Sequence, residues 1–385
     1  MKDQKGCVME EPDVYRIALS MVPGIGGITA RKILACTGSA EAVFSAPKKT
    51  LLGIPGVGDL LAERIHNTGI LDQARRELEF IIKKEITYLF YGEDAYPERL
   101  LDCYDAPMLL YKQGQVNLNG RRIISIVGTR RPGSYGTDMC KCLVRDLASY
   151  SRELVIVSGL AYGIDHCAHK SAMENGLDTV AVLGHGLKYM YPALHRQVAA
   201  KITLQGALLT DFASDQKPER NNFIRRNRII AGLSDVTIVV QSGHKGGALI
   251  TADIANSYHR DVFTFPGRVG DPASAGCNQL IKTHKAALIE GAGDVAYLLG
   301  WDTDPPVEKE TQGKPFLGLS DKEVQIIKIL RSEGHVSIDR ICLKCNVPVS
   351  RISEILLNLE LAGLIKCLPG DVYCAEDEAG LTSDI

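Results

Sequence analysis

Two adjacent arginines stand in a glycine-rich turn, the stretch IVGTRRPGSYG at residues 126–136. The turn follows an apolar run and precedes a helical pattern, which is where proteins place phosphate-binding loops. Its glycines have the Walker spacing GxxxxG, but Ser134 and Tyr135 replace the lysine and the hydroxyl residue that hold phosphates and magnesium. Backbone N–H groups and the guanidinium of Arg130 remain, and a guanidinium binds phosphate without a metal. We predict a phosphate contact, the alternative being a plain strand-to-helix turn; the residues are Gly128, Thr129, Arg130, Arg131 and Ser134.

A second basic stretch, KPERNNFIRRNR at residues 217–228, surrounds a single aromatic residue. It has five basic residues against one carboxylate, a local net charge of +4, in a chain whose formal charge is −2. A chain of this overall charge attracts nucleic acid only through such a local patch. Proteins that hold single strands let arginines follow the phosphates while bases stack on aromatic rings. We predict that role here, the alternative being a solvated helix start with the ring in the core; the residues are Lys217, Arg220, Phe223, Arg225, Arg226, Asn227 and Arg228.

Glycines follow two further apolar runs, Gly159 after LVIVS and the pair Gly246 and Gly247 in SGHKGGALITADIA. Glycine allows a backbone to approach a phosphate closely, so we expect these glycines and Lys245 to contact the same ligand. Nucleotide hydrolases of the lysine-decarboxylase-like type have the signature PGGxGTxxE on such a sheet, but only Asp253 stands near the place of their glutamate. The GxSxG turn of a nucleophilic serine is absent from the sequence. We predict binding without catalysis or cofactor, and keep a nucleotide-processing enzyme of that type as the alternative.

Seven short apolar runs supply the frame for these loops. They are RIISIV (122–127), LVIVS (154–158), DTVAVL (178–183), ALLTDF (207–212), DVTIVV (235–240), DVFTF (261–265) and ALIE (287–290). A helical pattern separates each pair of runs, which predicts a doubly wound α/β core with a mainly parallel sheet at residues 85–300. In such a sheet ligands bind beyond the carboxyl ends of the strands, where the glycine and arginine loops begin. The pattern therefore predicts one site built from loops that are distant in sequence.

The residues before the sheet contain a repeat. VPGIGGITARKIL at 22–34 and IPGVGDLLAERI at 54–65 share a Pro-Gly-apolar-Gly frame that precedes a helical pattern. This frame resembles a pair of helix-hairpin-helix motifs and predicts a small helical domain at residues 1–84. In the first copy Arg31 and Lys32 favour contact with a DNA backbone, whereas acidic residues in the second copy oppose it. Packing without any DNA contact is the alternative for both copies.

The last part of the chain begins after WDTDPPVEKETQGKPF, residues 301–316, which is rich in proline and charge and is predicted to be a linker. Three helical patterns, the first opened by a capping box of Ser320 and Glu323, and two apolar runs around a Pro-Gly-Asp turn then predict a winged-helix domain with a short acidic tail at residues 317–385. Seven basic residues balance seven acidic ones between residues 317 and 375. A surface with this charge balance binds phosphates poorly. The expected role of the domain is therefore contact with a protein or a weak contribution to DNA binding.

Composition points to a soluble protein with reduced thiols. The 385-residue chain has 11 cysteines, scattered and odd in number, which argues against a disulfide framework. Its N-terminal sequence has no apolar signal region, and no segment has roughly 18 uninterrupted apolar residues, so we expect a cytoplasmic protein without a membrane partner. Two groups have metal-ligand residue types: Asp165, His166 and His169, and Cys342, Cys345, Cys367 and Cys374. Helix capping, local hydrogen bonds and core packing explain both groups more simply, and no metal site is predicted.

Six motifs occur in one order and spacing: SIVGTRRPGSYG, SGLAYGIDHCAH, AVLGHGL followed by YP, FIRRNRIIAGLS, GGALITADIA, and FTFPG with GCNQLI. Together they resemble the DprA family, also called Smf, the DNA-processing proteins of bacterial transformation. The resemblance implies an extended Rossmann-like core that binds single-stranded DNA, forms a homodimer and loads the RecA recombinase onto the strand. It implies that Arg130 holds a phosphate and that Phe223 and Arg220 line a base pocket. Arg226 and Arg228 belong to its RNR signature.

The chain departs from the family pattern at two places. His185 stands where the family usually has a small residue, and Thr283-His284-Lys285 replaces a turn that contains glycine. Because an imidazole titrates near neutrality, His185 is expected to add a pH-dependent contact beside the groove. Neither departure changes the predicted function.

Overall fold

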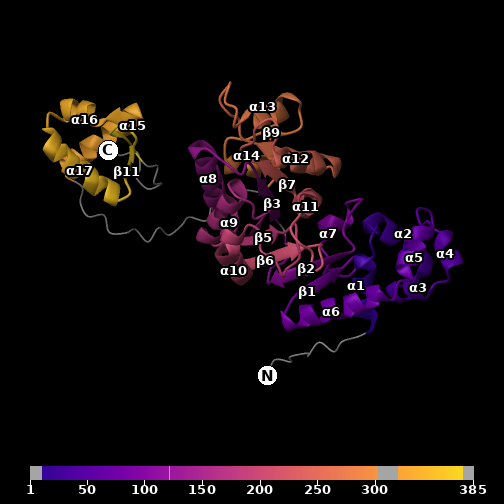
Figure 1. Ribbon diagram of the computed structural model, residues 1–385. Coiled ribbons are helices and arrows are strands. Elements are labelled where there is room, and N and C mark those ends of the chain that lie inside the picture. Colours follow the sequence, from indigo (N-terminus) through magenta and orange to yellow (C-terminus); the bar gives the residue numbers. More distant parts are fainter. Residues whose placement is uncertain (1–10, 121, 302–319, 376–385) are drawn as a thin grey trace. The chain divides into compact units, whose positions relative to one another are not determined.

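The computed structural model describes residues 11–120, 122–301 and 320–375, and the chain divides into two compact units, Met1–Glu308 and Lys309–Ile385 (Figure 1). The predicted linker at 301–316, apart from Trp301, and the predicted acidic tail beyond residue 375 lie outside the described residues. The domain boundaries expected from the sequence therefore stay predictions. Across the three described ranges, no helix is both long enough and apolar enough to span a membrane.

A nine-stranded sheet forms the centre of the first unit, in the order β1-β2-β6-β5-β4-β3-β7-β8-β9. Its strands are β1 (Thr87–Phe90), β2 (Leu109–Gly114), β3 (Arg122–Val127), β4 (Leu154–Ser158), β5 (Asp178–Val182), β6 (Gly206–Thr210), β7 (Val236–Val239), β8 (Asp261–Thr264) and β9 (Ala287–Leu288). Strands β3 to β9 pair in parallel with one another, whereas β1 and β2 pair antiparallel. The predicted mainly parallel α/β class is confirmed.

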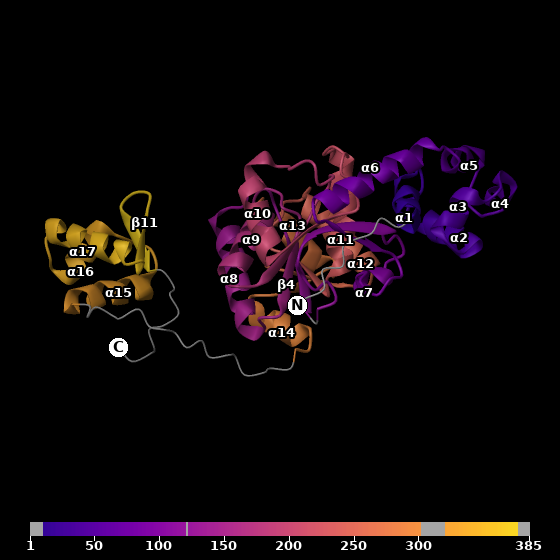
Figure 2. The ribbon, with the colours of Figure 1, turned by 90° about the horizontal axis from the view of Figure 1, so that it is seen from below.

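Helices cover both faces of this sheet (Figure 2). They are α7 (Glu98–Leu101), α8 (Ser134–Tyr150), α9 (Ile164–Glu174), α10 (Arg196–Gln205), α11 (Arg220–Leu233), α12 (Gly247–Ser257), α13 (Ala275–Lys282) and α14 (Ala292–Leu298). Alternate residues of β3 face different helices: Ile123 and Val127 share a core with α11 and α12, whereas Ile124 and Ile126 share one with α8, α9 and α14. Since both faces of the sheet are buried, the parallel strands consist mostly of apolar residues.

A small helical domain precedes the sheet. Its helices are α1 (Glu11–Met21), α2 (Gly27–Thr37), α3 (Ala40–Ser45), α4 (Lys48–Leu52), α5 (Asp59–Ile65) and α6 (Gly69–Lys83). The turns before α2 and α5 contain Gly24 and Gly56, whose φ angles are 92° and 97°, a conformation that favours glycine. The buried core of these helices continues into β1 and β2 through Phe90, Leu109 and Tyr111. The domain is therefore built onto the antiparallel edge of the sheet.

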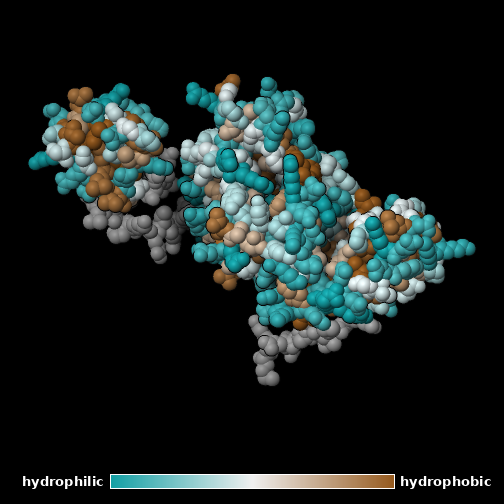
Figure 3. Space-filling view, viewed as in Figure 1, coloured by the Kyte–Doolittle hydropathy of each residue, from teal (hydrophilic) through white to brown (hydrophobic). Residues whose placement is uncertain are grey.

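The second unit is a winged helix, as predicted. It contains α15 (Asp321–Glu333), α16 (Ile338–Cys345), α17 (Val349–Leu361), and a sheet of β10 (Val336–Ser337), β11 (Ile365–Leu368) and β12 (Val372–Ala375). The predicted capping box is present: Ser320 Oγ accepts from the Glu323 N–H, and the Glu323 carboxylate accepts from the Ser320 N–H. Apolar side chains also reach the surface, since Leu343 and Leu361 are 82% and 79% exposed. Figure 3 shows apolar patches on the face of this unit that it presents.

A histidine occupies the turn before β9 that departs from the family pattern. The φ angle of His284 is 55°, in the left-handed region that glycine adopts without steric cost and other residues adopt less readily. The replacement therefore keeps the backbone shape that a glycine would allow. It leaves the last strand of the sheet in place.

Candidate functional site

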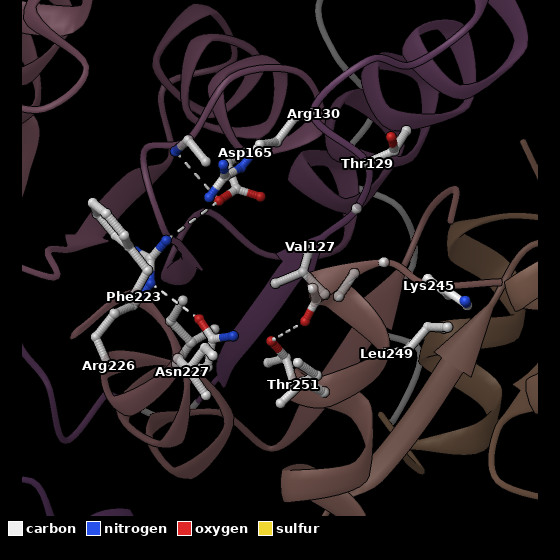
Figure 4. A pocket seen from close by; sticks show the side chains of 18 of the residues that line it. Val127, Thr129, Arg130, Asp165, Phe223, Arg226, Asn227, Lys245, Leu249 and Thr251 are labelled. Atoms are coloured by element: carbon white, nitrogen blue, oxygen red, sulfur yellow. Dashed lines mark hydrogen bonds and ion pairs between the residues drawn. The ribbon is translucent and has the colours of Figure 1, made fainter. Parts of the chain in front are cut away.

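A cavity of about 1010 Å³ opens at the carboxyl ends of the parallel strands. Its walls come from the turn after β3, the start of α9, one face of α11, and the segment that enters α12 (Figure 4). The predicted contacts in its lining are Gly128, Thr129, Arg130, Arg220, Phe223, Arg226, Asn227, Lys245, Gly246 and Gly247. Those outside the lining are Arg131, Ser134, Gly159, Lys217, Arg225 and Arg228. Loops distant in sequence thus meet at one edge of the sheet, as the strand pattern predicts.

The turn after β3 is held from both sides. The Thr129 N–H donates to the Gln241 carbonyl just after β7 (2.7 Å), and the Ile164 N–H at the start of α9 donates to the Thr129 carbonyl (3.1 Å). A side chain at Gly128 would collide with Ile164, whose Cγ1 is 2.6 Å from the Cβ position. These contacts fix the turn without a ligand, and Arg130 is exposed in the cavity lining.

One face of α11 forms a wall of the cavity. Phe223, Asn227 and Ile230 all line it, at the i, i+4 and i+7 spacing that places side chains on one side of a helix. In Figure 4 the α11 side chains lie across the cavity from Lys245 and Leu249. Helix α11 therefore presents an aromatic ring and an amide, those of Phe223 and Asn227, to the cavity.

Arg226 is buried, although the sequence predicts that this arginine contacts the phosphates of a strand. The residue is 4% exposed, and its Nη1 donates to the carbonyls of Gly159 (2.6 Å) and Val182, at the ends of β4 and β5. Its Nη2 lies 3.9 Å from Asp165 Oδ2 (Figure 4). Burial lowers the pKa of Arg226 to about 10, partly offset by Asp165, so the guanidinium stays charged at neutral pH. A Cβ at Gly159 would overlap this guanidinium, so the missing side chain makes room for Arg226.

Arg228 and Arg225 share one carboxylate, that of Asp211 after β6. The Nη2 of Arg228 lies 2.6 Å from Asp211 Oδ2, with its side chain only 16% exposed, and Nη1 donates to the Asp105 carbonyl. Arg225 is 59% exposed and 3.7 Å from the same oxygen. Both arginines line a smaller hollow of about 460 Å³. The exposed basic residues that remain in the stretch are Lys217, Arg220 and Arg225.

Two aromatic rings lie together in the cavity lining, those of Phe223 and Tyr191. Their centroids are 5.3 Å apart and their planes are tilted by 38°. Phe223 packs over Gly184, where a Cβ would lie 2.7 Å from the ring, whereas Tyr191 is 45% exposed. Sequence reasoning identified Phe223 and missed Tyr191. The available signal was the position of Tyr191 in the loop that follows β5, at the carboxyl end of a parallel strand.

His185 does not contact the cavity, which corrects the expected pH-dependent role. Its side chain is fully buried and lies outside the lining. Nδ1 is 3.0 Å from the Gly186 carbonyl and Nε2 is 3.2 Å from the Tyr191 N–H, a pattern that a neutral imidazole protonated at Nδ1 satisfies. Burial lowers the pKa of His185. The ring therefore fixes the loop that carries Tyr191.

Two carboxylates line the cavity, and each has a cationic partner. Asp165 accepts the Ala161 N–H (3.3 Å) and faces Arg226; burial raises its pKa and Arg226 opposes that rise. Asp253 Oδ1 lies 2.7 Å from Lys285 Nζ. Asp253 is the residue that stands nearest in sequence to the glutamate of the hydrolase signature, and its ion pair with Lys285 is exposed on both sides.

Asp165 and His169, two of the residues with metal-ligand side chains, make other contacts. Helix α9 is capped by Gly163 rather than by Asp165, so the expected capping role of Asp165 is wrong. His169 is fully buried, its Nδ1 is 2.7 Å from Thr179 Oγ1, and burial lowers its pKa to about 3. In the part of the chain that the structure describes, no three His, Cys, Asp or Glu side chains are arranged to hold a metal ion.

The first N-terminal hairpin packs against the core. Arg31 donates to the carbonyls of Tyr104 and Ala106, and the missing side chain of Gly27 lets α2 approach Ala106. Arg31 is thus engaged in docking the hairpin, and its expected contact with a DNA backbone stays a prediction. Lys32 is exposed.

Three family models match the chain. The model for DNA recombination-mediator protein A matches residues 87–300. The model for a SAM-like helix-hairpin-helix tandem matches residues 17–68, and that for the DprA winged helix domain matches residues 311–371. The matches follow the helical domain, the sheet and the winged helix in order.

Relatives with known names are similar over most of the chain. The putative DNA processing protein DprA of Mycobacterium tuberculosis is 31% identical over 82% of this chain and 83% of its own, and protein Smf of Escherichia coli is 33% identical over 80% and 85%. The structure of DNA processing protein A from Streptococcus pneumoniae has a TM-score of 0.60 at 30% identity, covering 75% of this chain and 98% of that one. A structure described for the single-stranded DNA binding mode of the Helicobacter pylori protein has a TM-score of 0.51 at 30% identity, covering 56% and 95%.

Proposed function

This chain belongs to the DNA recombination-mediator protein A family, also called DprA or Smf, and on that premise we propose that its cavity binds single-stranded DNA. The Helicobacter pylori relative is described by its single-stranded DNA binding mode. In this proposal the phosphates of the strand contact the exposed cationic side chains, and its bases enter the cavity. No base sequence is selected, because stacking accepts every base.

The pairing of exposed cations with aromatic rings in one cavity carries this proposal. Arg130, Arg220 and Lys245 are exposed residues of the lining, available to phosphates. Phe223 and Tyr191 offer aromatic surface inside it. A ring stacks on a base only when the base is not already stacked within a duplex, so the arrangement favours single strands. The buried Arg226 supports the loops, while Arg130 and Arg220 contact the strand.

We propose that the site acts by binding and not by catalysis. The turn after β3 lacks the lysine and hydroxyl residue of a nucleotide-hydrolysing loop. The two carboxylates of the lining, Asp165 and Asp253, face Arg226 and Lys285. Both carboxylates are therefore engaged in ion pairs. The alternative is a nucleotide hydrolase of the lysine-decarboxylase-like type.

We further propose that two copies pair through the core and that the bound strand is passed to the RecA recombinase in the cytoplasm during transformation. The family description as a recombination mediator supports this step. The winged unit has balanced charge and exposed leucines, which favours protein contact over phosphate contact. Strand exchange assays with RecA, and light scattering for the copy number, test the two parts separately.

Fluorescence anisotropy with labelled oligonucleotides tests the binding function. We expect the single strand to bind much more tightly than a blunt duplex of the same sequence at each of several salt concentrations. Equal affinity for the two forms across salt would contradict the proposal. A product assay with free nucleoside monophosphates separates the alternative, because a hydrolase releases base from them and a binding protein does not.

A further inference from the structure

We propose that Tyr191 is the movable half of an aromatic clamp that closes one nucleobase against Phe223. This inference rests on the proposed single-strand function and adds a residue and a mode of contact to it. Both rings belong to the lining of the main cavity, one from α11 and the other from the loop after β5. The two rings touch in this structure, with centroids 5.3 Å apart.

Phe223 is the fixed half of the clamp. Its backbone lies in α11, and the ring packs over Gly184, where a Cβ would lie 2.7 Å from Cδ1 and 3.1 Å from the Phe223 Cα. The ring and the helix backbone therefore both rest on the strand end behind them. The free side of the ring faces Tyr191 and the cavity.

Tyr191 has a fixed backbone and a free side chain. Its N–H donates to Nε2 of His185, a fully buried ring whose Nδ1 is 3.0 Å from the Gly186 carbonyl. The tyrosine side chain is 45% exposed, so it can rotate without opening the core. This explains what the unusual histidine does: it anchors the loop from which the movable ring projects.

The ring separation sets how far the clamp must open. Aromatic groups in contact lie about 3.5 Å apart face to face, so a base between two rings needs roughly 7 Å between them. The ring centroids of Phe223 and Tyr191 are now 5.3 Å apart. The Tyr191 ring must therefore move away by roughly 2 Å to admit a base, and a rotation of its side chain supplies this movement. The exchange replaces one ring–ring contact by two ring–base contacts.

The test compares three tyrosine variants of the full-length protein by anisotropy with a labelled single strand. Tyr191→Ala is expected to weaken binding by about 5- to 150-fold, the range for one stacked base, with an unchanged salt dependence. Tyr191→Phe keeps the ring and is expected to stay within about twofold of the parent. Tyr297→Ala is the matched control, since Tyr297 on α14 is 84% exposed and outside the cavity lining. It is expected to bind like the parent.

A double-mutant cycle with Phe223→Ala distinguishes a clamp from two separate contacts. If both rings hold one base, the double variant loses less affinity than the product of the two single losses. Multiplicative losses would mean that the rings hold different bases, and would overturn the clamp. Unchanged or tighter binding by Tyr191→Ala, with Phe223→Ala still weakened, would also overturn it and leave the proposed function standing. Parental affinity in Phe223→Ala and Arg130→Ala as well would remove the proposed function itself.

Discussion

The cavity has an exposed rim and a buried polar layer behind it, and α11 contributes arginines to both. Arg220 is exposed in the lining, whereas Arg226, six residues along the same helix, is 4% exposed and holds two strand ends together. A run of basic residues in the sequence therefore predicts a local positive charge, but it does not predict which of the side chains are exposed. In this account the rim acts on the ligand and the buried layer acts on the loops, so substitutions in the two regions should affect different measurements.

The largest expected effect is on stability, at Arg226. Arg226→Ala leaves the carboxylate of Asp165 buried without its cationic partner, and we expect the free energy of unfolding to fall by about 3–5 kcal/mol. Urea denaturation followed by circular dichroism measures it.

Arg220→Ala is the matched control, the same substitution on the same helix at the exposed rim. We expect its free energy of unfolding to stay within about 0.5 kcal/mol of the parent while its affinity for single strands falls. Parental stability in Arg226→Ala would show that the buried layer does not support the fold.

Acid should destabilise the protein through its buried histidines. Burial lowers the pKa of His185 and brings that of His169 to about 3. Below the ordinary histidine pKa of about 6.5 the unfolded chain binds protons that the folded protein refuses, so stability is fully present above that pH and is lost as the pH falls toward the folded pKa. The slope approaches about 1.4 kcal/mol per pH unit for each such histidine.

Urea denaturation at pH 7.5, 6.5 and 5.5 measures this slope, with His169→Gln as the comparison. The variant should lose part of the pH dependence. An unfolding free energy that is the same at pH 7.5 and 5.5 would contradict the neutral, buried state of these rings.

Phe223→Ala should change binding and leave stability unchanged, which is the behaviour expected of a residue at the exposed rim. We expect a loss of about 1–3 kcal/mol in binding to single strands, because one base loses its stacking surface. The melting temperature should stay near that of the parent, since the ring is only half-buried and faces the cavity. A melting temperature several degrees lower would assign this ring to the core instead.

The smallest expected effect is that of removing the winged unit. A chain that ends at Trp301 keeps the contact of that ring with Arg122, whose guanidinium lies 4.5 Å from the ring centroid. We expect it to bind single strands within about twofold of the full chain, because the seven basic and seven acidic residues between 317 and 375 cancel. A tenfold loss in a folded truncation would make the winged unit a main contact.

The fold was predictable from the sequence because both faces of the parallel sheet are buried. Every residue of β3, β4 and β7 is buried, so those runs consist mostly of apolar residues. Their polar members are Arg122, Ser125, Ser158 and Thr237. Strands β1 and β2 escaped prediction. They pair antiparallel at the edge of the sheet beside the helical domain. Their apolar side chains pack against the helices of that domain, and a local sequence pattern does not show that packing.

The position of the site was predictable, but the task of each side chain was not. Topology places the turn after β3, α11 and the segment before α12 at one edge, and the cavity lies there. Whether an arginine meets water or a carboxylate depends on partners far along the chain, as Asp165 is for Arg226 and Asp211 is for Arg228. Composition contains no information on such pairs, and it likewise hides the anchor that His185 provides for Tyr191.

The most direct test of the account compares the salt dependence of single-strand affinity in Arg130→Ala, Phe223→Ala and the parent. If the turn after β3 holds a phosphate, Arg130→Ala binds every sequence more weakly, and its plot of log K against log salt is shallower by about 0.7 for one lost contact. Phe223→Ala should lose affinity with the parental slope, since stacking releases no counterions. An Arg130→Ala protein with parental affinity and slope would contradict the account and leave residues 126–136 as a simple turn.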